Sequence, residues 1–217
     1  MHYVAAGKLA DAGKELRKVA AAKPDDAGAA RELGAVLGAV GDAKGAVEWV
    51  QKAAWLEPHN GLTCTMLAGY LIQDGDYVGA RSVSDRAVKL APQLRLARFY
   101  LGIARWKSGD RTGAVAAFED TLEVSPSDVP TLYCLAAIAG EMDRTEEAVR
   151  YLQQALAIAP QSGTGWVALG AAHLKLGQSA QAAAAFRRAL ATDPNDKAAQ
   201  AGLRAAGAVP PRAAGNG

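Results

Sequence analysis

Aromatic residues are scarce in this sequence, and their scarcity argues against a sheet core. Phenylalanine, tryptophan and tyrosine make up 6% of the 217 residues, although half of the chain is hydrophobic. Aromatic and β-branched residues dominate buried strands, whereas alanine is the strongest helix former. The alanine-rich composition therefore predicts an all-α fold with closely spaced helices.

A strong charge of one sign and a long hydrophobic run are also missing. The formal net charge is +2, and basic and acidic residues are interspersed. Such a balanced surface does not favour nucleic acid or an anionic membrane as a partner. Glycine or a charge interrupts each hydrophobic stretch before it reaches the about 20 residues of a membrane span. We therefore expect no nucleic-acid binding and no direct membrane insertion.

The sequence contains none of the common motifs for phosphate binding, nucleophilic catalysis, dinucleotide binding or zinc ligation. Its three histidines, His2, His59 and His173, lie far apart along the chain and favour structural roles. We therefore expect no enzymatic activity, no cofactor and no metal site. No signal-peptide pattern follows Met1, which indicates a cytoplasmic protein, or a periplasmic one if an export signal precedes this segment.

Six prolines recur at a constant interval and reveal an internal repeat. They are Pro24, Pro58, Pro92, Pro126, Pro160 and Pro194, each 34 residues after the one before. Leucine keeps the same step at Leu33, Leu67, Leu101, Leu135 and Leu169. Glycine does so at Gly7, Gly41, Gly75, Gly109 and Gly177, with Asp143 as the departure. A period of this length is typical of stacked helical repeats.

Each row has a physical cause in a unit of two helices. A small residue follows each leucine, where helix axes approach to about 8–10 Å and a larger side chain would overpack. Glycine supplies the left-handed turn that ends the first helix, and proline ends the second. Ser84 replaces a large apolar residue of its row, and Arg98 and Arg105 replace apolar ones. The third unit is therefore expected to pack more loosely or to hold an ion pair.

One segment carries the repeat in its fullest form: Trp166-Val167-Ala168-Leu169-Gly170, followed by Ala182, Phe186, Ala189 and Pro194. This pattern resembles the tetratricopeptide repeat, in the alanine- and glycine-rich style of bacterial arrays. The resemblance implies a right-handed α-solenoid of stacked helix-turn-helix units.

Counting from the proline row divides the chain into units. Residues 1–26 are a partial repeat whose first helix ends before Gly7, so the chain is expected to begin within a repeat. Five complete repeats follow at 27–60, 61–94, 95–128, 129–162 and 163–196. Residues 197–207 form a capping helix, because Arg204 stands where a small residue would permit further stacking. The segment 208–217 is expected to be a disordered tail.

The resemblance also implies where a partner binds. In tetratricopeptide proteins the first helices line a concave groove that accepts a peptide. The groove residues predicted here are Arg31, Ile72, Gln73, Phe99, Ile103, Trp106, Lys107, Tyr133, Glu141 and Lys175. Phe99, Trp106 and Tyr133 are predicted to form an aromatic hot spot. The alternative is that some of these rings fill gaps between repeats.

These features favour a protein-interaction scaffold or adaptor that binds a peptide or protein and supports a larger complex. A clamp for a C-terminal carboxylate is not expected, because Ala35 and Gly69 stand where it needs polar groups. Two other readings stay open: the accessory array of a longer enzyme such as a transferase, and a structural protein that self-associates through its truncated N-terminal end. Trp55 is predicted to be exposed, as a candidate second interface.

Two cysteines, Cys64 and Cys134, lie two repeats apart. Stacking at about 10 Å a layer separates them by about 20 Å, beyond the reach of a disulfide. We expect free, buried thiols.

Overall fold

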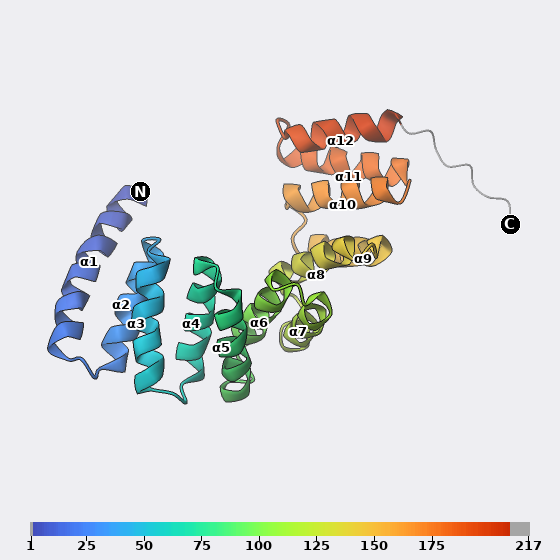
Figure 1. Cartoon of the computed structure of the whole chain (residues 1–217). Coiled ribbons are helices and arrows are strands. Elements are labelled where there is room, and N and C mark those ends of the chain that lie inside the picture. The colour runs from blue at the N-terminus through green and yellow to red at the C-terminus, as the bar shows by residue number, and fades with distance from the viewer. Residues whose placement is uncertain (1, 209–217) are drawn as a thin grey trace. The chain divides into compact units, whose positions relative to one another are not determined.

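The structure is a computed structural model that describes residues 2–208, with only the backbone described at residues 2–8, 10 and 208. These residues form twelve helices and no strand, so the predicted all-α solenoid is confirmed (Figure 1). The helices are α1 (His2–Ala22), α2 (Ala27–Ala39), α3 (Ala43–Leu56), α4 (Gly61–Asp74), α5 (Tyr77–Leu90), α6 (Arg95–Lys107), α7 (Arg111–Val124), α8 (Val129–Glu141), α9 (Thr145–Ile158), α10 (Gly163–Lys175), α11 (Ser179–Thr192) and α12 (Lys197–Ala208).

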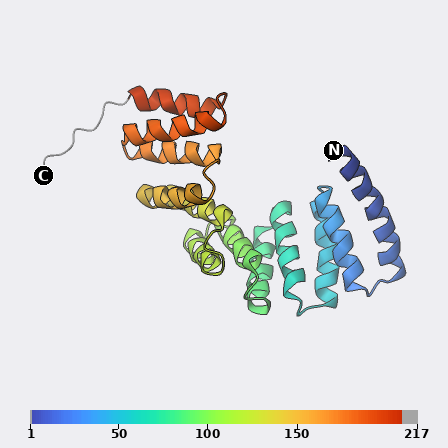
Figure 2. The same ribbon diagram turned by 180° about the vertical axis from the view of Figure 1, so that it is seen from behind.

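The helices are grouped into two compact units, each described here by itself. Unit 1 is Met1–Val124, with α1 to α7, and unit 2 is Ser125–Gly217, with α8 to α12. Within each unit every helix packs against the next one in the chain, as Figure 2 also shows. In addition α4 packs against α6, and α10 packs against α12. The first helices of the repeats are α2, α4 and α6 in unit 1 and α8 and α10 in unit 2, and the surface that they carry within each unit is called its first-helix face.

Proline and aspartate set the ends of the second helices. Helices α3, α5, α7, α9 and α11 each end two residues before a proline of the 34-residue row. Proline disfavours helical backbone in the residue before it, which explains this common end point. At the other end, the carboxylate of Asp42 accepts a hydrogen bond from the backbone N–H of Gly45 at 2.9 Å. Asp76 and Asp110 cap α5 and α7 in the same way.

The turn between the two helices of a repeat has left-handed backbone in every complete repeat. Gly41, Gly75, Gly109 and Gly177 have φ between 71° and 89°, a conformation that glycine adopts without strain. Asp143, the departure from the glycine row, has φ 57°. The fourth repeat therefore keeps the turn geometry with an aspartate, one of the residue types that tolerate this region.

The predicted turn at Gly7 is wrong, because α1 runs without a break from His2 to Ala22. Glycine inside a helix costs only about 1 kcal/mol, so it does not end a helix unaided. Gly41, Gly75 and Gly109 are each followed by an aspartate that caps the next helix, but Gly177 turns before Gln178, which supplies no side-chain cap. The segment 1–26 therefore does not divide into a helix end, a turn and a second helix. At the other end, Ala208 belongs to α12, and the rest of the predicted tail lies outside the described residues.

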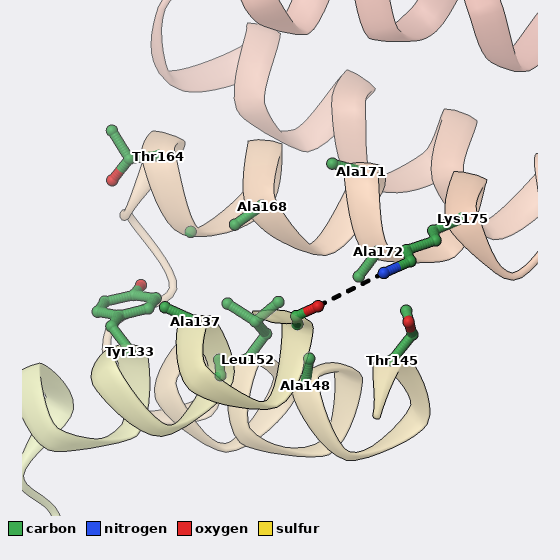
Figure 3. Close-up of a pocket in the computed structure, with 13 residues that line it drawn as sticks. Tyr133, Ala137, Thr145, Ala148, Leu152, Thr164, Ala168, Ala171, Ala172 and Lys175 are labelled. Atoms are coloured by element: carbon green, nitrogen blue, oxygen red, sulfur yellow. Dashed lines mark hydrogen bonds between the residues drawn. The ribbon is translucent and has the colours of Figure 1, made fainter. Parts of the chain in front are cut away.

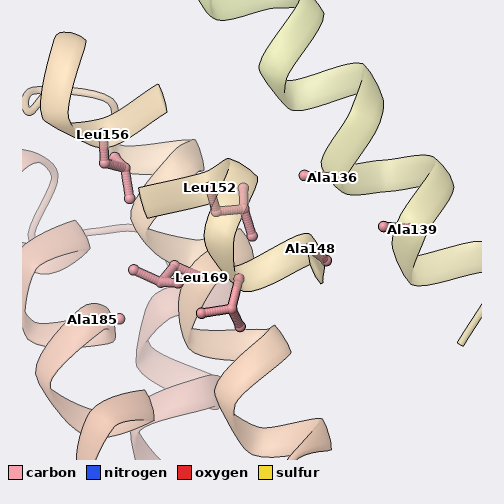
Figure 4. Close-up of a cluster of buried hydrophobic side chains, with 8 residues drawn as sticks. Ala136, Ala139, Ala148, Leu152, Leu156, Leu169 and Ala185 are labelled. Atoms are coloured by element: carbon pink, nitrogen blue, oxygen red, sulfur yellow. The ribbon is translucent and has the colours of Figure 1, made fainter. Parts of the chain in front are cut away.

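The repeat rows form the cores of both units. Every leucine of the leucine row is buried, and so are the alanines that keep the same 34-residue step in the second helices: Ala46, Ala80, Ala114, Ala148 and Ala182. Where the residue after the leucine is a glycine, it faces a large side chain: an added Cβ would lie 2.4 Å from Val50 at Gly34, 2.6 Å from Phe118 at Gly102 and 2.7 Å from Phe186 at Gly170. Figure 4 shows the main cluster of unit 2, where Leu152 and Leu169 meet. These contacts explain why the rows alternate between small and large residues.

Arg105 of the third repeat forms an ion pair, and its partner, Asp85, belongs to the second repeat. Arg105 lies 3.4 Å from the carboxylate of Asp85 and donates a hydrogen bond to the carbonyl of Gly113 at 3.1 Å. Ser84 is fully buried, and its hydroxyl has no hydrogen-bond partner among the described residues. Ser84 of the second repeat thus stands next in the chain to Asp85, the residue that pairs with Arg105 of the third repeat.

The two thiols are not equivalent. Cys64 is fully buried, and the guanidinium of Arg86 donates to its sulfur at 3.2 and 3.3 Å. Cys134 is partly exposed, so the expectation that it is buried is wrong. No disulfide joins these two residues.

Candidate functional site

All ten predicted groove residues belong to first helices, and none of them is buried. Seven belong to unit 1 and three, Tyr133, Glu141 and Lys175, to unit 2. The predicted hot spot takes Phe99 and Trp106 from unit 1 and Tyr133 from unit 2. The hot spot as a single cluster of three rings stays a prediction, because its members belong to two different units.

The aromatic residues of α6 have different surroundings. The ring of Phe99 packs against buried Phe118, with centroids 5.7 Å apart, and against Tyr100 at 6.0 Å. Phe99 therefore contributes to the core of its own repeat. Trp106 is half-buried near the end of α6, and the ammonium of Lys107 lies 5.0 Å from its ring centroid. Trp106 is thus a half-buried aromatic of α6 with a lysine beside its ring.

Two of the predicted cationic residues are already engaged. Arg31 forms an ion pair with Glu57 and donates to the hydroxyl of Thr63 at 3.3 Å. Lys175 lies 2.7 Å from the carboxylate of Asp143. The hydrogen bond from Lys175, and then its positive charge, lower the pKa of Asp143 below its ordinary value. A carboxylate of a ligand would therefore share these cations with residues of the chain.

Two tyrosines that were not predicted as functional fill the space between neighbouring first helices in unit 1. Tyr70 of α4 lies against Gly38 of α2, where an added Cβ would stand 2.2 Å from the ring. Tyr100 of α6 lies against Gly69 of α4, where an added Cβ would stand 3.0 Å from the ring. Burial, and then the neighbouring Tyr100, raise the pKa of Tyr70. These contacts close both interfaces between first helices in unit 1.

Unit 2 has a cavity of about 550 Å³ at the corresponding place (Figure 3). Helices α8 and α10 form its two sides. Residues of α9, among them Ala148 and Leu152, form its base. Of the predicted groove residues, Tyr133 and Lys175 line this cavity together. The structure thus brings these two residues to one site. Glu141, also on α8, is exposed and does not line it.

Small residues create the cavity. Ala172 has the same position in the 34-residue unit as Tyr70, three repeats later. Ala168 likewise has the position of Tyr100, two repeats later. Both alanines line the cavity, as do Ala137 and Gly140 on the opposite helix. All four contact positions are therefore small in unit 2. These four small residues were the signal for the cavity in the sequence. The leucine and proline rows do not include these positions, so they did not reveal it.

The polar atoms of the cavity stand near its two ends. At one end the hydroxyl of Tyr133 is buried and has no hydrogen-bond partner among the described residues. It lies close to α10, where a Cβ at Gly165 would stand 2.2 Å from the tyrosine oxygen. At the other end Lys175 donates to the carbonyl of Gly140 at 3.4 Å (Figure 3). The long walls between these ends are apolar.

Within residues 2–208, acidic, histidine and cysteine side chains nowhere gather in the threes or more that a metal ion would need. His173 is buried, and its Nδ1 lies 2.6 Å from Oε1 of Gln178, which agrees with a structural role. None of the helices in this range combines the length and the hydropathy of a membrane span.

A helix-turn-helix repeat with a left-handed turn, buried leucine and alanine rows and a surface of first helices defines a helical-repeat protein. Family models described as Tetratricopeptide repeat match residues 65–129 and 139–207, together more than half of the chain. The chain belongs to the tetratricopeptide-repeat family. Compared by sequence with curated proteins, it has no match.

Solved structures share the fold at low sequence identity. The structure of pilF from Pseudomonas aeruginosa is 19% identical with a TM-score of 0.74, and covers 92% of this chain and 91% of that one. MamA from Desulfovibrio magneticus RS-1 is 20% identical with a TM-score of 0.72, over 79% of this chain and 97% of that one. YrrB, described as a TPR protein with an unusual peptide-binding site, is 14% identical with a TM-score of 0.70, over 87% and 97%. These similarities establish the fold.

Proposed function

We propose that the protein is an interaction scaffold that binds a peptide segment of a partner on its first-helix face and so supports the assembly of a larger complex. The observation that carries the proposal is that the first helices leave apolar surface open. In unit 1 Ile72, Ile103 and Trp106 are only half-buried, and in unit 2 the cavity separates α8 from α10. The proposal involves no catalytic step.

Two further facts support this proposal. YrrB, which shares the fold, is described as having a peptide-binding site. The surface also combines a tryptophan with neighbouring polar groups, such as Gln73 and Lys107, which are exposed. Tryptophan at an interface supplies a large, rigid contact area, and residues of this kind dominate measured binding energies.

The experiment compares two tryptophans of unit 1. A pull-down from the native cell identifies the bound partner, and isothermal titration calorimetry then measures the affinity of its binding segment. Trp106→Ala is expected to weaken binding by more than about 1 kcal/mol, or about fivefold or more, because the ring belongs to the proposed interface. Circular dichroism checks that the variant keeps its helices.

Trp55→Ala is the matched control. Trp55 lies on the second helix α3, and 78% of its surface is exposed, as the sequence predicted. Under the proposal its removal leaves affinity unchanged. If Trp106→Ala binds as the wild type does, or if Trp55→Ala alone weakens binding, the first-helix face is not the interface and the proposal is wrong.

A further inference from the structure

We infer that the cavity between α8, α9 and α10 binds a tyrosine side chain of the partner, in a segment where a carboxylate lies next to the tyrosine. The inference rests on the proposed function and specifies the chemistry of one part of that surface. Its starting point is the chain itself, which places its own tyrosines at the equivalent positions of unit 1.

The glycines opposite these positions show that the space in unit 2 is empty. Gly38 has no room for a side chain, because the ring of Tyr70 would be 2.2 Å from an added Cβ. Gly140 occupies the same repeat position, yet an added Cβ there would meet no atom within 4 Å. The helix pair in unit 2 thus keeps the glycine that makes room for a ring, while Ala172 replaces the ring itself.

The size and the walls of the cavity suit an aromatic side chain together with part of the peptide that carries it. Its volume of about 550 Å³ falls in the range of sites that bind small ligands. Alanine and leucine side chains form most of the walls, with Thr164 near the Tyr133 end and Thr145 near the Lys175 end, so most of the ring would leave water for apolar surroundings.

The two polar ends distinguish tyrosine from other large side chains. A buried hydroxyl without a partner is unfavourable, and that of Tyr133, which lies against Gly165, would pair with the phenol of a bound tyrosine by turning towards the cavity. Phenylalanine and leucine lack this group. Among the described residues that line the cavity, Lys175 is the one with a charge. Its ammonium has three donors, of which Asp143 and the carbonyl of Gly140 take two, so one remains for a second carboxylate. The positive charge therefore favours an acidic neighbour of the tyrosine.

The test uses N-acetyl-L-tyrosine, whose own carboxylate supplies the acidic group, as a probe of the ¹⁵N-labelled full chain. Amide shifts of Ala137, Gly140 and Ala172 are expected to change with millimolar probe. N-acetyl-L-phenylalanine is expected to bind about fivefold more weakly, because it leaves the Tyr133 hydroxyl unpaired. Tyr133→Phe is expected to remove this difference. Lys175→Gln is expected to weaken the binding of N-acetyl-L-tyrosine about threefold. The binding of N-acetyl-L-tyrosinamide, a probe without a carboxylate, is expected to stay the same in this variant.

Ala172→Tyr places in the cavity the tyrosine that unit 1 has at the same repeat position, Tyr70. It is expected to abolish the shift changes and to raise the melting temperature, whereas Ala191→Tyr, on the exposed face of α11, changes neither. Gly140→Leu blocks the same space if the first variant does not fold. The inference is wrong if N-acetyl-L-tyrosine shifts no cavity amide, if N-acetyl-L-leucine binds equally well, or if the filled variants still bind. In those cases the proposed function would still hold if Trp106→Ala weakens the binding of the partner.

Discussion

In unit 1 adjacent first helices meet through a tyrosine ring on a glycine, whereas in unit 2 the same repeat positions bring alanine against alanine or glycine. The first arrangement closes the interface, and the second leaves a cavity of about 550 Å³. Both occur in one chain with the same 34-residue period and the same turn geometry. The repeat backbone therefore does not decide whether neighbouring first helices are sealed. The side chains at four contact positions, two on each helix, decide it.

Other contacts hold α10 in place and explain why unit 2 tolerates the gap. The indole of Trp166 donates to the carbonyl of Pro160 at 2.8 Å, which fixes the start of α10 to the loop after α9. Lys175 anchors its end to Asp143. Leu169, in the middle of α10, belongs to the core cluster that includes Leu152 and Leu156 of α9. The face of α10 towards α9 thus supplies the packing that its face towards α8 lacks.

The largest effect is expected from giving unit 1 the open interface of unit 2. Tyr70→Ala removes a half-buried ring from the space above Gly38 and should lower the free energy of unfolding by about 2–3 kcal/mol, below the value for a fully buried aromatic. Urea denaturation followed by circular dichroism measures the change. Tyr70→Phe keeps the ring and serves as the control. A loss below about 0.5 kcal/mol would show that the tyrosine does not seal the interface.

A matched pair of glycines gives the next largest effects, with opposite signs. Gly38→Ala forces the ring of Tyr70 to move and should cost about 1–3 kcal/mol through overpacking. Gly140→Ala meets open space and should stabilise the protein by about 0.5–1 kcal/mol, because alanine is the better helix residue. Thermal unfolding of both variants under one condition checks the prediction. Equal effects of the two substitutions would mean that the interfaces are packed alike.

The sequence predicted the fold well because the repeat rows record direct contacts. Gly34 is small because Val50 lies against it, and the helices end where proline makes them end. The prediction at Gly7 was wrong because glycine inside a helix costs only about 1 kcal/mol and does not end the helix unaided. One row alone was therefore insufficient to place a turn.

The candidate site was harder to predict, since it depends on pairs of rows from neighbouring repeats. Phe99 was predicted to belong to the groove, yet its ring packs on Phe118, and only coordinates separate a groove-facing ring from one that supports the core. The cavity follows from small residues at four positions at once, two on each helix. Ala168 and Ala172 carry no functional group, so a search for chemistry in the sequence does not find them.

The smallest effect concerns the ion pair near the cavity and again compares the two units. Lys175 and Lys107 share a repeat position, but the turn residue that pairs with Lys175 is Asp143, whereas the matching residue in unit 1 is Gly75. Because the folded state lowers the pKa of Asp143, the pair stabilises the protein at neutral pH, and this contribution is lost as the pH falls through the lowered pKa.

Lys175→Gln should therefore lower the melting temperature slightly at pH 7, and the difference from the wild type should vanish in acid. NMR titration of the Asp143 side-chain carboxyl should show its pKa returning upwards in this variant, because the hydrogen bond and the charge that lower it are gone. Lys107→Gln, which removes a lysine facing a glycine turn, should leave that titration unchanged. An unaltered pKa of Asp143 in Lys175→Gln would show that the two residues do not interact in solution, and that α10 is held against α8 by its other contacts alone.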